Sequence, residues 1–291
     1  MEVLSDFQAR ATRSKEKMIL VLARSGQTCN QLMTIVAAYA LGLRYNEDVK
    51  CPIVDDKLKD WFLFSSSVSP IKMEVYNTPW MYWLIRVLNG VLSRLCIRNL
   101  VFRNRYNPKR HGRIQMLFDR CWHKEDSAII ENLREVQRFF AFKPDIADRG
   151  ERFVRDLRDG ADGRKLVAVH ARRGDYREFQ GGRYYFTDEE LGFWMRALAS
   201  HDSVRFVFFS NEKINLSYYR NLGLDVVQSD GDAIDDLCRM SKCDYVMGPD
   251  STYSWFAMMM GHIPRLMLEK GHGPYLLDDF KLYEDAPNLR G

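Results

Sequence analysis

Two arginines stand side by side directly after a predicted buried strand. The strand is LVAVHA (166–171), and Arg172, Arg173 and Asp175 follow it. An arginine keeps its positive charge in proteins, and its planar guanidinium group matches the oxygens of a phosphate. Ligands of open α/β sheets bind beyond the carboxyl ends of the strands. The pair therefore predicts an anion-binding site at this strand, with a salt-bridged surface pair as the alternative.

A second candidate anion site lies at Ser251 and Thr252. These residues follow the predicted strand DYVMG (244–248) and precede the predicted helix SWFAMMMG (254–261). Backbone N–H groups and the dipole at a helix N-terminus favour an anion, whereas a helix cap without a ligand is the simpler interpretation. Two such features at strand ends of one predicted sheet together indicate a phosphate site.

Further polar residues follow other predicted strands, and Asp230 and Asp232 among them form a pair of carboxylates. Such a pair suits a divalent cation, but acidic turns of this kind are common and the loop interpretation is favoured. No GxxxxGK[ST] or GxGxxG pattern follows a strand, which argues against a P-loop nucleotidase and a standard dinucleotide enzyme. The other polar positions at strand ends are Ser25, Gly26, Gln27, Asn30, Gln31, His170, Ser210, Asn211, Ser229 and Asp250.

Strands and helices alternate around these residues. In the C-terminal half, further strands are predicted at 204–210, 224–229 and 264–268, with helical patterns between them. This alternation predicts βαβ units and a parallel sheet. The N-terminal half opens in the same way, with a strand at 18–23 and a helix at 32–45.

The fold class that follows is α/β with two domains. A polar segment between about residues 143 and 163 marks a shift in composition, and we place the division there. The predicted domains are 1–150 and 151–291. No internal repeat of fixed period is present.

The totals limit the class of protein. The chain has 291 residues and a net charge of +4, which permits an anionic ligand but does not by itself indicate nucleic acid. The six cysteines form no CxxC pair, so free thiols in a reducing compartment are expected. The N-terminus is too polar for a signal peptide, and no apolar run reaches the ~18–20 residues that span a bilayer. We expect a cytoplasmic protein.

Residues 80–96 have apolar positions with a helical period, and the strongly basic segment Arg98–Arg113 follows. One interpretation is a helix that lies on a membrane surface, which would place the protein peripherally on the inner face of a membrane. The other is a core helix followed by a solvated basic loop. The second is favoured, because the helix itself carries only Arg86 and Arg94.

Four segments resemble the α-1,2-fucosyltransferases, within the wider fucosyltransferase superfamily. HARRGDY (170–176) resembles the HxRRGDY signature of that family, and SGQTCNQLMTIVAAYALG (25–42) resembles its GGLGNQ-type loop and helix. FVFFSNE (206–212) resembles its strand ending in Ser-Asp, and MSKCDYVMGPDSTYSWFAMMMG (240–261) resembles its MSxC…NSSFSWW segment.

The chain also departs from the pattern of the family. SGQTCNQ lacks the glycine pair of GGLGNQ, Asn211 stands where Asp is usual, and Phe256 replaces the second Trp. Residues 50–145 match no motif of the family, and we expect them to set the acceptor.

The resemblance implies a GT-B fold of two facing Rossmann-like domains, with the donor GDP-fucose in the C-terminal one and the acceptor on the N-terminal side. It implies inverting, metal-independent transfer of fucose to a hydroxyl of a glycan, α-1,2 to a galactoside, with no cofactor. The implied catalytic residues are Arg172, Arg173, Asp175 and Glu178. The implied donor-site residues are Asn30, Gln31, His170, Arg172, Ser210, Asp236, Ser251 and Thr252.

The resemblance also implies particular roles. Arg172 binds the diphosphate, and Arg173 supports it or reaches the donor. Asp236 falls where the superfamily keeps a carboxylate for the guanine edge. Asp175 and Glu178 are the candidate general bases, and for Asp175 a structural bond to the arginines is favoured.

Three alternatives stay open. One is a glycosyltransferase that uses another nucleotide sugar. The second is a metal-dependent transferase that uses Asp230 and Asp232. The third is a non-catalytic relative that binds an anionic glycan or lipid through the basic segment Arg98–Arg113.

Overall fold

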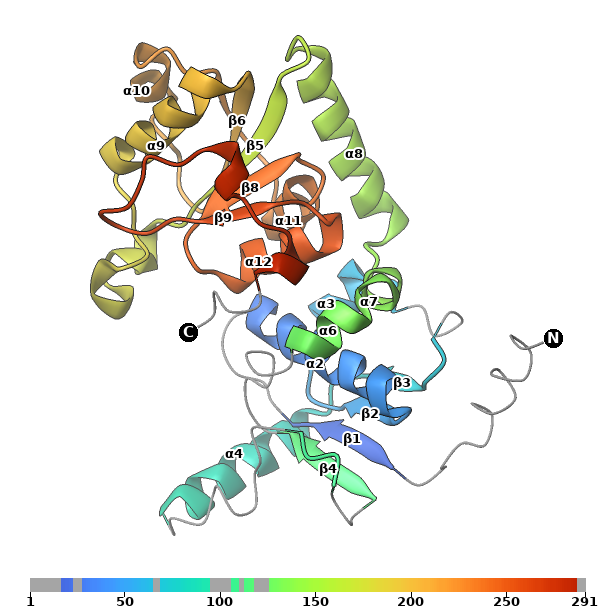
Figure 1. Ribbon diagram of the computed structural model, residues 1–291. Coiled ribbons are helices and arrows are strands. Elements are labelled where there is room, and N and C mark those ends of the chain that lie inside the picture. Colours follow the sequence, from blue (N-terminus) through green and yellow to red (C-terminus); the bar gives the residue numbers. More distant parts are fainter. Residues whose placement is uncertain are drawn as a thin grey trace, which may run out of the picture. The chain divides into compact units, whose positions relative to one another are not determined.

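The computed structural model describes residues 17–22, 28–64, 69–94, 106–109, 113–117 and 126–286. The chain forms two compact units, Met1–Ala141 and Phe142–Gly291 (Figure 1). The division lies just before the segment in which the sequence places it, and not at residue 150. The reason is helix α8 (Pro144–Asp159), which packs against helix α11 (Ala233–Met240) of the second unit. Arg149 and Lys242 reinforce this contact through ion pairs with Asp235 and Glu151.

The first unit is built on a parallel sheet with the strand order β3-β2-β1-β4. Its strands are β1 (Met18–Val21), β2 (Asp48–Cys51), β3 (Met73–Val75) and β4 (Ile114–Leu117). Helix α2 (Thr28–Tyr45) contacts β1 and β2, and every residue from Gln31 to Gly42 is buried. This burial confirms the predicted helix that is apolar on all sides.

Four shorter helices complete the described part of this unit: α3 (Lys57–Trp61), α4 (Pro79–Arg94), α6 (Asp126–Glu131) and α7 (Leu133–Phe139). The sequence predicts one helix over 125–142, and the structure divides it at Asn132. An aromatic cluster holds α7 against α2, since Tyr39 stacks on Phe139 with ring centroids 4.2 Å apart.

The position of α4 contradicts the core-helix interpretation of residues 80–96. Ile85 is buried, but the apolar stripe that carries the helical period is exposed at Trp80, Leu84, Val87, Leu88 and Val91. Most of the basic segment that follows α4 lies outside the described residues.

The second unit holds a five-stranded parallel sheet with the order β7-β6-β5-β8-β9. Its strands are β5 (Lys165–Ala171), β6 (Val204–Ser210), β7 (Val226–Gln228), β8 (Tyr245–Gly248) and β9 (Arg265–Met267). All five predicted strands are confirmed, with ends shifted by no more than two residues. The chain moves outward from β5 to β7 on one side and from β8 to β9 on the other. The strand order therefore reverses between β5 and β8.

Helices cover both faces of this sheet (Figure 1). Helices α9 (Asp188–His201) and α10 (Leu216–Asn221) share one core cluster with alternate residues of the strands, among them Val167, Phe206 and Val226. Helices α8, α11 and α12 (Thr252–Gly261) contact one another or β8 on the opposite face. Two 3-10 helices, η3 (Gly174–Arg177) and η4 (Phe179–Gly182), lie between β5 and α9.

The described cysteines agree with the prediction of free thiols. Cys29, Cys51, Cys238 and Cys243 are buried and form no disulfide bond. Cys96 and Cys121 lie outside the described residues.

Candidate active site

The carboxyl ends of β5 and β8 lie next to each other, because the two strands pair in parallel from Val167↔Tyr245 to Val169↔Met247. The residues after β5 and the start of α12 therefore meet at the point where the strand order reverses. In open α/β sheets this switch point is the usual ligand site. Gly248 permits the close approach of the strands, since a Cβ there would lie 2.8 Å from the His170 carbonyl oxygen.

The side chain of Arg172 lies on the partly solvent-exposed side of this junction, which we call the outer side. Its Nε and Nη2 donate to the two carboxylate oxygens of Asp175 at 3.1 and 3.2 Å. Its guanidinium lies 5.2 Å from the ring centroid of Tyr176, and the Tyr176 hydroxyl is hydrogen-bonded to Ser251. The contact with Asp175 confirms the structural bond that the sequence favours. These bonds connect the arginine loop to the start of α12.

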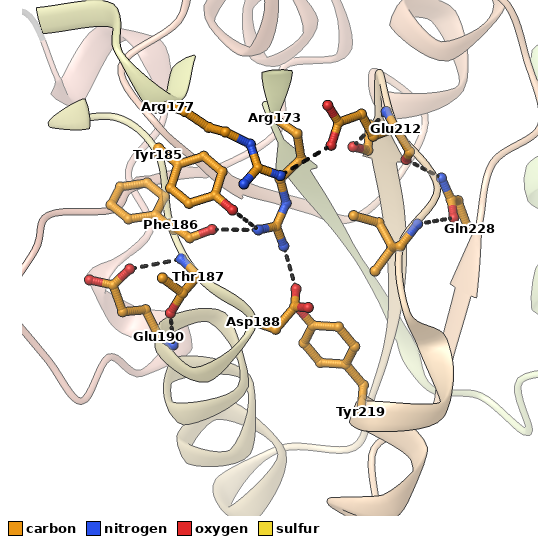
Figure 2. Close-up of polar contacts among 12 residues, drawn as sticks. Arg173, Arg177, Tyr185, Phe186, Thr187, Asp188, Glu190, Glu212, Tyr219 and Gln228 are labelled. Carbon is orange, nitrogen blue, oxygen red and sulfur yellow. Dashed lines mark hydrogen bonds and ion pairs between the residues drawn. The ribbon is translucent and has the colours of Figure 1, made fainter. Parts of the chain in front are cut away.

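The side chain of Arg173 is buried on the opposite side of the loop, next to α9, which we call the inner side. Its guanidinium donates to the Tyr185 hydroxyl at 3.2 Å and to the Phe186 carbonyl at 2.9 Å, and pairs with the Asp188 carboxylate. Asp188 also accepts from the Tyr219 hydroxyl at 2.7 Å (Figure 2). These contacts anchor the loop to α9, so they favour a positioning role for Arg173 over a direct contact with a ligand.

The extended backbone at Arg173 (φ −111°, ψ −155°) directs adjacent side chains to opposite sides, and Gly174 follows as the first residue of η3. The φ of Gly174, 55°, lies in the left-handed region, which glycine adopts without steric cost. A Cβ there would also lie 3.1 Å from Asn211 Nδ2. Asn211 in turn accepts from the Arg173 N–H at 2.9 Å. Asparagine in place of the expected Asp still satisfies this backbone group.

His170 is a buried, neutral imidazole at the end of β5. Burial, together with the charges of Arg172 and Arg265, lowers its pKa to about 3. Its ring centroid lies 5.2 Å from that of Tyr253. Nδ1 has no hydrogen-bond partner among the described residues. A buried ring nitrogen without a hydrogen bond is uncommon in protein cores, and this one is available to a ligand.

The start of α12 is capped as the sequence predicts. Ser251 Oγ accepts from the Tyr253 N–H at 3.3 Å, and Thr252 is the first helical residue. Asp250 accepts from the Trp255 indole N–H at 2.7 Å. Ser251 thus caps the helix, and a role for Ser251 and Thr252 in holding phosphate oxygens stays a prediction.

Asp236 lies on α11 beyond the end of β7. Its Oδ1 accepts from Ser229 Oγ at 2.5 Å, and Arg239 Nη1 lies 3.9 Å away. Burial raises the pKa of Asp236 to about 6, against the lowering effects of Ser229 and Arg239. The carboxylate is therefore largely ionised at neutral pH and becomes protonated in mildly acidic solution.

The carboxylates proposed for a metal ion have other partners. Asp232 is the N-cap of α11 and accepts from the N–H groups of Ile234 and Asp235 at 3.0 and 2.9 Å. Asp230 pairs with Arg239 at 2.9 Å. The part of the chain that the structure describes contains no cluster of three or more metal-ligating side chains. These contacts agree with the favoured interpretation of an acidic turn.

The remaining predicted residues are more scattered. Ser210 Oγ accepts from the Glu212 N–H at 3.2 Å, and Glu178 is exposed between η3 and η4. Asn30 and Gln31 lie on α2 of the first unit, where Gln31 is buried. Its Oε1 has no hydrogen-bond partner among the described residues. Ser25, Gly26 and Gln27 lie outside those residues.

Sequence reasoning missed the residues that position the site. Asp188 and Tyr219 hold Arg173, Tyr176 connects Arg172 to Ser251, and Arg239 lies beside Asp236. Only two of these contacts had a signal in the sequence. Tyr176 follows Arg172 by four residues in the motif, and Arg239 follows Asp236 by three on a helix, a spacing that places side chains together.

No protein-family model matches the chain, and no curated protein matches it. Several solved structures are similar to the chain. NodZ alpha-1,6-fucosyltransferase soaked with GDP-fucose is 13% identical over 88% of this chain and 97% of its own, with a TM-score of 0.58. POFUT1 in complex with GDP-fucose is 9% identical over 91% of this chain and 100% of its own, with a TM-score of 0.51.

A third similar structure is a mutant of Arabidopsis thaliana FUT1 in complex with GDP. It is 11% identical over 97% of this chain and 78% of its own, with a TM-score of 0.59. At these identities the likeness is one of fold. It extends over most of the chain. The chain therefore has the α/β fold with parallel sheets that these GT-B-like fucosyltransferase structures share.

Proposed function

We propose that this chain is an inverting glycosyltransferase that moves fucose from GDP-fucose to a hydroxyl of a glycan acceptor without a metal ion or cofactor. The observation that carries the proposal is the junction of Arg172 and the α12 N-terminus at the carboxyl ends of β5 and β8. The similar structures support the choice of donor, because NodZ alpha-1,6-fucosyltransferase was soaked with GDP-fucose or co-crystallised with GDP, and POFUT1 is in complex with GDP-fucose.

The diphosphate of the donor would lie between Arg172 and the first N–H groups of α12. The guanidinium offers fixed, forked donors, and the helix start offers backbone N–H groups aligned with its dipole. Ser251 and Thr252 would add hydroxyl donors, and the unpartnered Nδ1 of His170 faces a polar group of the ligand in this proposal.

Asp236 would form hydrogen bonds with the guanine base of the donor. An ionised carboxylate accepts two hydrogen bonds, and the Watson–Crick edge of guanine offers two N–H donors in that arrangement. Uracil offers one N–H flanked by two carbonyl oxygens, which a carboxylate repels. Arg239 would hold Asp236 in its charged form. Selection of GDP over UDP follows from this geometry.

Catalysis would depend on the charge of the leaving group. Negative charge grows on the diphosphate as the glycosidic bond breaks, and donors already aimed at it stabilise the transition state. Arg172 and α12 would supply this stabilisation, while Arg173 keeps the loop in place from the inner side. His170 stays neutral because of its low pKa and so acts as a hydrogen-bonding group rather than a charge.

Of the two candidate bases, Glu178 is the better proposal. Both carboxylate oxygens of Asp175 accept from the Arg172 guanidinium, so they are already engaged with another partner. Glu178 is exposed on the same loop. The acceptor hydroxyl would lose its proton to this group as it attacks the face of the sugar opposite the diphosphate.

The linkage is proposed from the motif. HARRGDY resembles the α-1,2 signature, so transfer to the 2-hydroxyl of a galactoside is proposed, whereas NodZ is an α-1,6-fucosyltransferase. Methylation analysis of the fucosylated product distinguishes the two. A 6-linked product would overturn the linkage and leave the donor assignment intact.

The test of the donor is a calorimetric titration with GDP, GDP-fucose, GDP-mannose and UDP-sugars in the presence of EDTA. Guanine nucleotides should bind, and Arg172→Ala should weaken binding by about tenfold to a hundredfold because a charge-assisted contact is lost. Arg196→Ala, an exposed arginine on α9, is the matched control and should leave binding unchanged.

Three outcomes would overturn parts of the proposal. Preference for UDP-sugars would favour the alternative of another nucleotide sugar. Loss of binding in EDTA would favour the metal-dependent alternative. Absence of nucleotide binding altogether would favour a non-catalytic relative that keeps the fold.

A further inference from the structure

Helix α4 has two apolar faces, and only one of them packs on the protein. Ile85 lies in a small core cluster with Leu22 and Ile53, and Met81 and Tyr82 pack against that cluster. The opposite face is exposed. Its residues are Trp80, Trp83, Leu84, Val87, Leu88 and Val91, which we call the outer face of α4.

The outer face is a continuous stripe. Its residues follow the spacing i, i+3, i+4, i+7, i+8 and i+11, which places all six along one side of a helix. Trp80, Trp83 and Val87 are 67, 61 and 63% exposed. A Cβ added at Gly90 would meet no atom within 4 Å. Figure 1 shows α4 projecting from the sheet of the first unit.

Scattered exposed apolar residues are normal on protein surfaces, but a contiguous stripe with two tryptophans marks an interaction site. Within the described residues no helix is long and apolar enough to cross a bilayer. The stripe is therefore suited to an interaction at a surface rather than to a membrane span.

The charges in the sequence that contains α4 indicate the kind of partner that the outer face binds. Residues 75–118 contain no aspartate or glutamate, and their basic residues are Arg86, Arg94, Arg98, Arg103, Arg105, Lys109, Arg110 and Arg113. Arg86 lies on α4 itself, with its guanidinium 5.3 Å from the Trp83 ring centroid, and Arg94 is exposed in the last turn. The partner of the outer face must offer an apolar region for these side chains and negative charge beside it.

We propose that the outer face of α4 inserts into the interface of an anionic lipid bilayer, with the helix parallel to the membrane plane. Tryptophan rings are favoured at the boundary between acyl chains and headgroups. Arginine side chains extend from such a depth to lipid phosphates. Apolar burial and attraction to anionic lipid add together in helices of this kind.

Charge also disfavours a second copy of the chain as the occupant. A two-fold contact through this face would place the same surface patch on both sides. Arg86 and Arg94 of each copy would then approach those of the other, with no acidic residue within 75–118 to compensate. An anionic lipid surface avoids this repulsion.

Vesicle flotation with the full chain tests the proposal. The probes are vesicles of phosphatidylcholine alone and of equal parts phosphatidylcholine and phosphatidylglycerol. The chain should float with the anionic vesicles and remain unbound with the neutral ones. Trp83→Gln combined with Val87→Gln should reduce binding at least about tenfold, because two side chains no longer enter the apolar boundary.

Phe193→Gln is the matched control, since Phe193 is a 54% exposed apolar residue on helix α9. It should float like the unchanged chain, and thermal unfolding of all variants should coincide. Equal flotation of the α4 variant would overturn the proposal. So would a vesicle-independent dimer in sedimentation that the α4 substitutions dissociate, because the outer face would then bind a second copy.

Discussion

The loop after β5 has an outer and an inner side, and the two sides use the same residue type differently. On the outer side, Arg172 is partly exposed and bonds to Asp175, whose side chain is 53% exposed. On the inner side, Arg173 is buried and bonds to Asp188 and two aromatic neighbours (Figure 2). Adjacent identical residues can therefore differ in burial and in partners. Arg173 anchors the loop, and Arg172 is accessible for the ligand contact that we propose.

The largest expected effect is on turnover and belongs to the outer side. Arg172→Ala should lower kcat by about a hundredfold to a thousandfold, because an electrostatic donor to the leaving group is lost. The thermal midpoint should remain near that of the unchanged chain, since the Arg172–Asp175 pair faces solvent. Turnover of fucose and calorimetry on the same preparation measure the two effects. A large drop in the thermal midpoint would contradict the division between the sides.

The inner side should show the opposite pattern. Arg173→Ala leaves Asp188 with one partner fewer in a mostly buried setting, so the free energy of unfolding should fall by about 2–3 kcal/mol. Urea unfolding measures this directly. Arg173→Lys should recover only part of the loss, because an ammonium group cannot satisfy Tyr185, Phe186 and Asp188 in the plane of one fork. A variant of normal stability but no turnover would instead place Arg173 at the ligand.

The pKa of Asp236, which lies on α11, gives a pH-dependent test of the site. Its folded pKa of about 6 lies above the ordinary value of 3.8. The folded chain thus binds more protons than the unfolded chain between these values, and stability contributed by Asp236 is lost as pH rises through this window. Asp236→Asn should remove that pH dependence.

Donor binding should respond to the same group with the opposite sign. Guanine N–H groups need the ionised carboxylate, so affinity for GDP-fucose should fall up to about tenfold per pH unit below 6. The diester diphosphate of GDP-fucose does not titrate in this range, whereas free GDP does. Arg172→Ala should weaken binding equally at all pH values and serves as the control. A flat profile would remove Asp236 from the base site.

Features determined by residues close together in the sequence could be predicted, whereas contacts between residues far apart in the sequence could not. Strands β5 to β9 were predictable, because short apolar runs bounded by turns determine them. The meeting of Arg172 and Ser251 at neighbouring strand ends was predictable, because parallel topology brings strand ends together. Binding of an anion there stays a prediction. Asp188 and Tyr219 were not, since they lie 15 and 46 residues beyond Arg173 and meet it only after α9 and α10 pack.

Helix α4 shows a further limit. Its helical period was visible in the sequence, but a period places apolar residues on one face without saying whether that face is covered. The sequence favoured a core helix, and the structure buries Ile85 while exposing Trp80 and Val87. Only tertiary packing decides which of two apolar faces reaches the core.

The smallest expected effect separates two roles for Asp175. Asp175→Asn should change the free energy of unfolding by less than about 0.5 kcal/mol, since an exposed ion pair contributes little. If Asp175 only orients Arg172, kcat should fall modestly and the affinity for GDP should stay or rise, because the guanidinium loses a competing anion. If Asp175 is the general base, kcat should fall by about a hundredfold or more with affinity unchanged. Glu178→Gln, measured beside it, should then show the reciprocal result, and a large loss in only one of the two variants identifies the base.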